Sequence, residues 1–404
     1  MLVKRELYLS RLREFYDSNL IKIIYGVRRS GKSEILKQIK QELLDSGVAS
    51  DHIIYMNLED LQYYDYLNAI AFNKFMINQM KDEEKYYILI DEIQMVDDFQ
   101  RAINSLRATK NCSIFVTGSN AKILSGELAT LLGGRYISIK VMPFVFEEVL
   151  SYMNEKNIDK QMLFNDYMKW GGMPQRFELS SESAVQAYLE DVISTILYKD
   201  IMLDQKKADK VLTMKILNYL YDNTGNLYSD NKVYNELSQS TLDLKKPKVY
   251  AIISRITDAM AISKCKRYDI QGKNILSLFE KYYAVDLGLK RAMHLNDRPN
   301  YGRALETIMY NELIARGYQV YVGKTYKGEV DFLVLNGDKR CYIQVSYLLN
   351  DDKVIEREFG AFKDITDNFP KYVVSLDQQD FSQNGITHIN IIDLLSGVRK
   401  LDFL

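Results

Sequence analysis

The chain has 404 residues, and at about one domain per 150 residues this length predicts two or three domains. Its 53 Lys and Arg residues nearly balance its 54 Asp and Glu residues, so no overall field draws it onto nucleic acid or an anionic membrane. With 26% charged residues, 47% hydrophobic residues and 5 prolines, the composition is that of a globular protein and excludes extensive disorder.

Cysteine usage and hydropathy bear on the compartment. The 3 cysteines are odd in number and far apart, which favours small buried side chains in a reducing compartment over disulfides. The first residues carry charges every few positions, unlike a signal peptide, and no run approaches the roughly 18 apolar residues of a membrane span. We therefore expect a cytoplasmic protein with no membrane partner.

Residues 1–145 alternate short apolar runs with helical periodicity, which predicts a parallel α/β sheet. The strands are expected at 21–25, 53–56, 86–90, 113–117 and 136–141, with amphipathic helices after Ser33 and from 99 to 106. From 146 to about 205 the pattern is mostly helical and is interrupted by Trp-Gly-Gly-Met-Pro at 170–174. We interpret this second segment as a helical lid.

Residues 206–300 form a basic segment inside a nearly neutral chain. From Lys206 to Arg291 there are 16 Lys and Arg against 9 Asp and Glu, a net charge of +7 that leaves −8 for the rest. Three helical patterns come first, followed by ISKCKRYDI and NILSLFEKYYAVDLGL, for which a hairpin and a further strand are expected. This order is that of a winged helix-turn-helix.

Residues 301–404 predict a further compact α/β unit. A helix over LETIMYNELIARG precedes the strand-like runs YQVYV, EVDFLVL and CYIQVSYLL. A helical stretch around 354–366, the strand KYVVSL and a terminal helix after Asn390 complete it.

A phosphate-binding loop follows the first expected strand. GVRRSGKS matches G-x-x-x-x-G-K-[ST] in full and leads into a helical pattern, the context that distinguishes the motif from a chance glycine-rich turn. The loop must turn backbone N–H groups inward around phosphates, through conformations that a β-carbon would hinder. The expected ATP-binding residues are Gly26, Val27, Arg28, Arg29, Ser30, Gly31, Lys32 and Ser33. Lys32 would reach the β- and γ-phosphates, and Ser33 would bind Mg²⁺.

An acidic pair ends the third expected strand, in YYILIDEIQ. Asp91 fits the carboxylate that holds Mg²⁺, and Glu92 fits the base that orients the attacking water. Acid pairs at strand ends are common, but this pair stands 59 residues after the lysine of a complete phosphate-binding loop. The two motifs together predict nucleoside triphosphate hydrolysis.

GVRRSGKS, LIDEIQ, IFVTGSNAKILS and LLGGRYISIKVMPFVFEEVL together resemble a bacterial and archaeal branch of the AAA+ ATPases. The resemblance covers nearly the whole chain. It implies an AAA+ ATPase core at 1–145, a helical lid at 146–205, a winged helix at 206–300 and a PD-(D/E)xK restriction-endonuclease-like domain at 301–404. ATP and Mg²⁺ are the cofactors it implies.

The same resemblance suggests further catalytic residues in the ATPase core. Ser119 or Asn120, in VTGSN, would sense the γ-phosphate and the attacking water, although a turn closed by their side chains is an alternative. Arg135, in GGRY, would neutralise charge on a γ-phosphate, either in its own chain or in a neighbouring subunit of a homo-oligomer. A structural ion pair is the alternative for Arg135. Arg28 and Arg29 could contact nucleotide, a partner subunit or solvent.

GEVDFLVLNGDKRCYIQVSY resembles the core of the PD-(D/E)xK nuclease fold. Glu306 lies in the preceding helix, and Glu329 and Asp331 are two apart on a strand and should point to one side. The next strand, however, has Gln344 and Ser346 where the motif has an acid and a lysine.

This departure weakens the chemistry, because glutamine brings no charge to a hard cation and serine cannot replace an ammonium. Lys324, Lys327 or Lys353 could stand in for the missing lysine. The sequence therefore favours a degenerate nuclease site, with weak metal binding through Glu306 and Asp331 as an intermediate case.

The leading hypothesis for function is Mg²⁺-dependent ATP hydrolysis coupled to DNA binding or remodelling. The basic clusters at 245–248 and 264–267 would contact phosphates without sequence specificity, unless they are simply solvated ends of elements. A nucleotide-controlled switch that binds a partner protein is the alternative, and an ATP-coupled nuclease is a third hypothesis.

Overall fold

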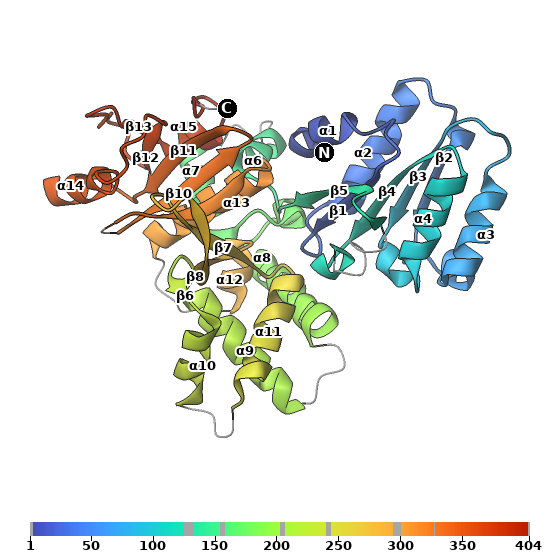
Figure 1. Ribbon diagram of the computed structural model, residues 1–404, viewed down its shortest axis with the longest axis horizontal. Helices are drawn as coiled ribbons and strands as arrows, with labels where there is room; N and C mark the ends of the chain where they lie inside the picture. Colours follow the sequence, from blue (N-terminus) through green and yellow to red (C-terminus); the bar gives the residue numbers. More distant parts are fainter. Residues whose placement is uncertain are drawn as a thin grey trace. The chain divides into compact units, whose positions relative to one another are not determined.

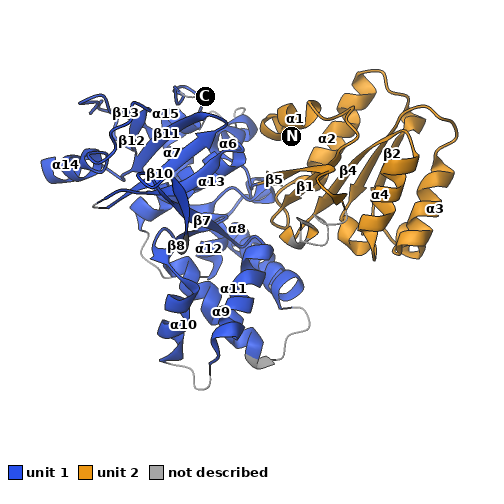
Figure 2. Ribbon diagram, viewed as in Figure 1, with its two compact units in different colours: residues 1, 142–404 blue, residues 2–141 orange. Residues whose placement is uncertain are grey.

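A computed structural model describes residues 3–124, 132–153, 158–202, 207–239, 244–293, 300–326 and 328–402. The chain forms two compact units, residues 2–141 and 142–404, each with its own sheet (Figure 2). Lys327, one of the candidate nuclease lysines, lies outside the described residues.

The first unit contains a five-stranded sheet in the order β2-β3-β4-β1-β5, and all four strand pairs are parallel (Figure 1). This confirms the predicted α/β class. The strands are β1 (Ile21–Gly26), β2 (Ile53–Asn57), β3 (Tyr86–Asp91), β4 (Cys112–Gly118) and β5 (Tyr136–Val141).

Helices cover this sheet because their apolar residues recur at helical spacing. In α4, Phe99, Ala102, Ile103 and Leu106 are all buried and pack in one core with the strands and with α3. Within residues 3–124 the α-helices are α1 (Glu6–Arg13), α2 (Lys32–Asp45), α3 (Ala69–Gln79) and α4 (Phe99–Thr109). Short 3₁₀ turns lie at η1 (Ser50–His52), η2 (Leu61–Tyr66), η3 (Ile93–Met95) and η4 (Ala121–Leu124).

The second unit begins with helices, as the sequence predicts for the segment after 146. They are α6 (Phe146–Met153), α7 (Lys160–Trp170), the 3₁₀ turn η6 (Pro174–Glu178), α8 (Glu182–Thr195) and the π-helical turn η7 (Ile196–Ile201). The interruption at 170–174 is a close-packed chain crossing, because a β-carbon on Gly172 would come within 2.0 Å of the carbonyl oxygen of Phe144.

The basic segment follows, and its described residues form four helices and three strands. Its elements are α9 (Lys207–Asp222), β6 (Leu227–Tyr228), α10 (Asp230–Ser238), α11 (Lys246–Asp258), β7 (Ile262–Asp269), β8 (Asn274–Ala284) and α12 (Leu287–Met293). The expected strand through Leu289 is wrong at its end, where α12 begins. Asp286 stops the strand, since its carboxylate accepts a hydrogen bond from the Leu289 amide 3.1 Å away and caps the helix.

The carboxyl-terminal elements complete an eight-stranded mixed sheet in the order β13-β12-β11-β10-β9-β7-β8-β6. They are α13 (Tyr301–Ala315), β9 (Gln319–Lys324), β10 (Glu329–Asn336), β11 (Lys339–Val345), α14 (Asp352–Gly360), β12 (Lys371–Ser375), β13 (Thr387–Asn390) and α15 (Ile391–Leu395). Strand β7 pairs in parallel with β9, so the hairpin of the basic segment shares one sheet with the last hundred residues. This pairing brings β8 close to the predicted nuclease-like acids.

Within the described ranges no helix has the length and apolar character needed to cross a bilayer. All 3 cysteines are buried and unpaired by disulfides.

Candidate nucleotide site and carboxylate cluster

The carboxyl ends of β1, β3 and β4 meet at one edge of the parallel sheet. Strand β4 lies between the other two, with Tyr25 of β1 opposite Gly118 and Ile90 of β3 opposite Val116. The phosphate-binding loop follows β1, the acidic pair ends β3, and Ser119 and Asn120 follow β4. The structure therefore brings these predicted residues to one edge of the sheet. Arg135, the remaining predicted residue of the ATPase site, is not among them.

The two loop glycines are needed for different reasons. Gly31 has a φ of +99°, in the left-handed region that side chains disfavour. Gly26 is required by close approach, because a β-carbon there would lie 2.2 Å from the carbonyl oxygen of Val141. Arg29 also has a positive φ, +63°, and its side chain is exposed, whereas Val27 is buried in the core.

The loop fits a phosphate group. Helix α2 begins at Lys32 without a side-chain cap, so its first N–H groups remain for an anion. Nζ of Lys32 lies 3.1 Å from the carbonyl oxygens of both Gly26 and Val27, which holds the ammonium across the loop. Oγ of Ser30 is buried and has no hydrogen-bond partner among the described residues. These groups suit the charge and hydrogen-bonding needs of a nucleotide phosphate.

Arg5 supports the loop from the amino-terminal segment. Its side chain is buried, and Nη1 donates a 2.7 Å hydrogen bond to the Ser30 carbonyl. Its guanidinium also lies 4.8 Å from the centre of the Tyr8 ring on α1. Sequence reasoning missed Arg5, because nothing in the charged amino-terminal run distinguishes it from its neighbours.

Thr117 joins the two acids of β3 and was also missed. Its hydroxyl donates to Oδ1 of Asp91 and accepts a 2.9 Å hydrogen bond from the Glu92 amide. Asp91 and Thr117 are both buried. The signal in the sequence was a polar residue before the glycine of VTGS, two positions before Ser119 and three before Asn120.

Glu92 is held in a constrained conformation. Its φ is +57°, which a non-glycine residue adopts at an energetic cost and often at functional positions. Gln94 donates a hydrogen bond from Nε2 to Oε2 of Glu92. The carboxylate proposed as the base is therefore held by an amide from the following 3₁₀ turn.

Oxygen groups for Mg²⁺ are present at this edge. Ser33 lies in the first turn of α2, which follows β1. Asp91 ends β3, which is separated from β1 by β4. A hydroxyl and a carboxylate are the hard ligands that Mg²⁺ prefers, together with phosphate oxygens. Burial, followed by the negative charge of Asp91, raises the pKa of Tyr55 on β2 to about 12, so this phenol stays neutral beside the acids.

Arg135 lies at the opposite edge of the sheet. Its carbonyl accepts a 3.0 Å hydrogen bond from the Ile21 amide at the start of β1, and its side chain is exposed. The six residues of β1, at about 3.3 Å per residue, separate it from the loop of its own chain. Asn120, in contrast, follows β4 beside the acids.

A second cluster forms in the carboxyl-terminal half of the chain. Nζ of Lys281 on β8 lies 2.8 Å from Glu306, 3.1 Å from Glu329 and 3.1 Å from Asp331. The three predicted acids do come together, but around an ammonium that the sequence did not suggest. Among the described residues, no group of three His, Cys, Asp or Glu side chains is arranged to hold a metal ion.

Ionisation in this cluster is strongly coupled. Although burial disfavours the ammonium, the carboxylates, with Asp331 first, hold the pKa of Lys281 well above its ordinary value. Burial, then the charge of Asp331, raises the pKa of Glu306 to about 7. The hydroxyl of Tyr283 also donates to Glu306 at 2.7 Å.

Gln344 has hydrogen bonds that an acid in its place could not make in full. Its Oε1 accepts from the Asp331 amide at 3.1 Å, and its Nε2 donates to Glu358 at 2.9 Å. A carboxylate at 344 would face Glu358 without a donor. Of the alternative lysines, Lys324 pairs with Asp269 at 3.3 Å, and Lys353 lies exposed on α14.

Replacing Thr117 with Val should remove both hydroxyl contacts while keeping the shape of the side chain. We expect the free energy of unfolding to fall by about 1–3 kcal/mol, because a buried carboxylate oxygen and an amide lose a partner. ATP turnover should fall about tenfold or more. Urea unfolding and steady-state ATP hydrolysis measure these two effects.

Thr109→Val is the matched control, since the hydroxyl of Thr109 donates to the helical carbonyl of Ser105 at an exposed position. If Thr117→Val hydrolysed ATP like this control, the assigned role of Thr117 would be refuted.

Family models match three successive segments of the chain. An AAA domain matches residues 18–150, and domains of unknown function, DUF8612 and DUF4143, match residues 161–300 and 301–394. The AAA match covers the phosphate-binding loop, the acidic pair and Thr117, and it supports nucleotide binding and hydrolysis.

Similar proteins occur in bacteria and archaea. An uncharacterized protein of Methanocaldococcus jannaschii is 29% identical over 393 residues, which cover 93% of this chain and 85% of that one. Among solved structures, the Aeropyrum pernix ORC1 protein in complex with DNA is 12% identical, with a TM-score of 0.33, and the match covers 73% of this chain and 93% of that one.

An uncharacterized protein of Haemophilus influenzae is 35% identical over 401 residues, which cover 98% of both chains. The chain thus belongs to the family of this Haemophilus influenzae protein, and it carries an AAA domain followed by two domains of unknown function.

Proposed function

We propose that the protein is a Mg²⁺-dependent ATPase whose turnover is coupled to DNA binding or remodelling. One observation carries the ATPase part of the proposal. A complete phosphate-binding loop, the Asp91–Glu92 pair and a polar β4 end lie on one edge of a parallel sheet.

The residues divide the work of hydrolysis. Lys32 and the loop amides bind the phosphates of ATP, and Glu92 orients and deprotonates the attacking water. Ser33 and Asp91 would hold Mg²⁺, which when bound neutralises phosphate charge. Asn120 contacts the γ-phosphate or the water. Since Arg135 lies at the far edge of its own sheet, any contact with a γ-phosphate would have to be made in a neighbouring subunit.

The order of elements supports a winged helix in the basic segment. The sequence α9-β6-α10-α11-β7-β8, with β6 and β7 both antiparallel to β8, is the order of helices and strands in that motif. Lys245, Lys246 and Arg255 are exposed on or next to α11, which would contact DNA phosphates. Lys248 forms a salt bridge with Asp209 instead.

The second basic cluster contributes less. Lys264 lies 3.4 Å from Asp230 and 3.6 Å from Glu280, so its charge is largely balanced. We therefore place the main DNA contact at the start of α11, and the second cluster adds the exposed Lys266.

A nucleotide-controlled switch is the second candidate, and the Gln94 contact favours it. An amide that binds the Glu92 carboxylate competes with the water that the carboxylate must orient. A protein that releases this contact only on binding a partner would turn over slowly on its own. Stimulation of ATP turnover by DNA would favour the coupled ATPase over a switch that is controlled by a partner protein.

The carboxyl-terminal domain, on this proposal, is a degenerate nuclease-like scaffold. The ammonium of Lys281 lies among the acids that would otherwise bind a divalent cation. The second carboxylate oxygen of Asp331 accepts a 3.0 Å hydrogen bond from the Val345 amide. Each acid thus already has a protein partner.

Two substitutions test the ATPase part. Lys32→Ala should abolish nucleotide binding by removing the charge that faces the phosphates. Glu92→Gln should keep ATP binding but reduce hydrolysis by a factor of about 100 or more, because the amide keeps the shape and loses the base. Titration with a fluorescent ATP analogue and steady-state hydrolysis separate the effects. Unmodified turnover in Glu92→Gln would show that another group is the base.

DNA binding should weaken steeply with added salt, because each neutralised phosphate contributes about 0.9 to the slope of log K against log salt. Replacing Lys245 and Lys246 with Ala should reduce this slope by about 2 and the affinity about tenfold. Fluorescence anisotropy on duplex DNA measures both. Lys353→Ala with Lys363→Ala removes the same charge from exposed sites elsewhere. An equal effect in both pairs would argue against a contact at α11.

Lys281→Met should destabilise the protein by about 3 kcal/mol or more at pH 8, because it leaves three clustered carboxylates without a counter-charge. The variant's carboxylates would then have raised pKa values, so the loss should shrink as the pH falls to 5 and they are protonated. Mn²⁺ should stabilise the variant and not the parent.

Urea unfolding at both pH values measures these effects, with Lys324→Met as the control because it removes a lysine from a partly exposed pair with one carboxylate, Asp269. Equal stability of Lys281→Met and the parent at pH 8 would contradict the described role of Lys281.

A further inference from the structure

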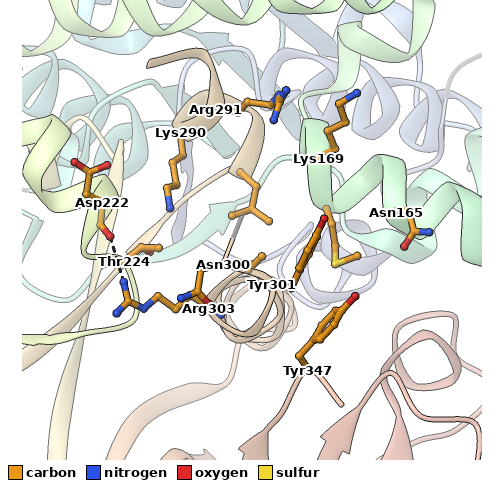
Figure 3. A pocket seen from close by; sticks show the side chains of 13 residues that line it. Asn165, Lys169, Asp222, Thr224, Lys290, Arg291, Asn300, Tyr301, Arg303 and Tyr347 are labelled. Carbon is orange, nitrogen blue, oxygen red and sulfur yellow. Dashed lines mark hydrogen bonds between the residues drawn. The ribbon is translucent and has the colours of Figure 1, made fainter. Parts of the chain in front are cut away.

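A cavity of about 770 Å³ lies within the unit formed by residues 142–404 (Figure 3). Its walls come from α7, the end of α9, α12, the start of α13 and the residue Tyr347 after β11. This volume is in the range of pockets that bind small ligands. Neither the nucleotide site nor the exposed face of α11 includes any of these residues.

The charge of the cavity wall is positive. Four cationic side chains line it, Lys169, Lys290, Arg291 and Arg303, against one carboxylate, Asp222. Lys169 forms a salt bridge with Glu182, and the guanidinium of Arg291 lies 4.9 Å from the centre of the Trp170 ring. Nη1 of Arg303 donates to the main-chain carbonyl of Asp222 at 3.3 Å, a neutral partner that positions the guanidinium without cancelling its charge.

Two aromatic rings also line the same cavity. Figure 3 shows Tyr301 and Tyr347 close together, with Arg303 projecting from the other side of helix α13. Their ring centres are 5.0 Å apart and their planes differ by 20°, so the rings stack. Tyr301 keeps 44% of its surface exposed, which leaves part of the ring available for a further planar group.

The cavity lies next to the carboxylate cluster. Arg303 and Glu306 are one turn apart on α13, and Glu306 gives its carboxylate to Lys281 and Tyr283. A β-carbon on Gly225, beside Thr224 of the cavity wall, would lie 3.2 Å from Oε2 of Glu306. The Lys281 contact offsets negative charge that would otherwise repel an anion from this wall.

Cationic side chains and stacked aromatic rings that line one cavity are a combination suited to single-stranded nucleic acid. We infer that this cavity binds one or two nucleotides of a single strand, with a base stacked on Tyr301 and the adjoining phosphates at Arg303, Lys290 and Arg291. The bases of a duplex stack on one another inside the helix, so they could not stack on Tyr301. The inference rests on the proposed coupling to DNA. It adds that the DNA is single-stranded where it enters this cavity, and that the cavity is a contact separate from α11.

Fluorescence anisotropy of the full chain without ATP tests the inference, with a labelled 15-nucleotide thymidylate strand and an abasic strand of the same length. The parent should bind the thymidylate strand about tenfold more tightly than the abasic one, through stacking. In Tyr301→Ala this difference should disappear, and in Tyr301→Phe it should remain. Arg303→Gln should weaken both strands equally and reduce the salt slope by about 0.7.

Tyr326→Ala is the matched control, because Tyr326 is 76% exposed and does not line the cavity. Equal affinity of the parent for the two strands, or an unchanged preference in Tyr301→Ala, would overturn the inference. Tyr301-dependent binding of free thymidine monophosphate with no binding of the strand would overturn the assignment to a polymer. Because the readout needs no ATP, a failed ATPase and a failed cavity give different results.

Discussion

Strand β4 lies between β1 and β3 and pairs in parallel with both. Parallel pairing places three carboxyl ends at one edge, so a loop after β1 and acids at the end of β3 come together although 59 residues separate Lys32 from Asp91. Thr117 on β4 orients both acids, because its hydroxyl donates to the carboxylate of Asp91 and accepts from the amide of Glu92. Without β4 in this position, Asp91 and the Glu92 amide would lose the hydroxyl that joins them.

The parts of the site that the sequence predicted are those carried by local motifs. GVRRSGKS and YYILIDEIQ each define their residues within one short segment, and the sheet then determines that the segments meet. Arg5 and Thr117 could not be predicted in the same way, because each acts through a partner distant in sequence. Even for Gly26 the reason differs from the expected one, since the constraint is the carbonyl of Val141 rather than an unusual φ.

In the second half of the chain, contacts between residues distant in sequence were even harder to predict. Glu306, Glu329 and Asp331 were predicted to gather, and they do, but their partner Lys281 comes from a hairpin that the sequence assigned to the basic segment. Only the parallel pairing of β7 with β9 brings that hairpin into the same sheet. The substitution at Gln344 has a physical reason in this setting, because its amide joins the Asp331 backbone to Glu358.

These features fit the proposed function: a nucleotide site lies at one sheet edge, and the acids of the carboxyl-terminal half surround Lys281. The proposal adds that exposed cations of this half contact DNA. Steady-state ATP turnover by the full chain with Mg²⁺, measured without DNA and with single-stranded, duplex and four-way DNA, tests this account most directly. We expect slow basal turnover that at least one DNA form stimulates severalfold. Absence of hydrolysis under every condition, or identical turnover with and without all DNA forms, would contradict it.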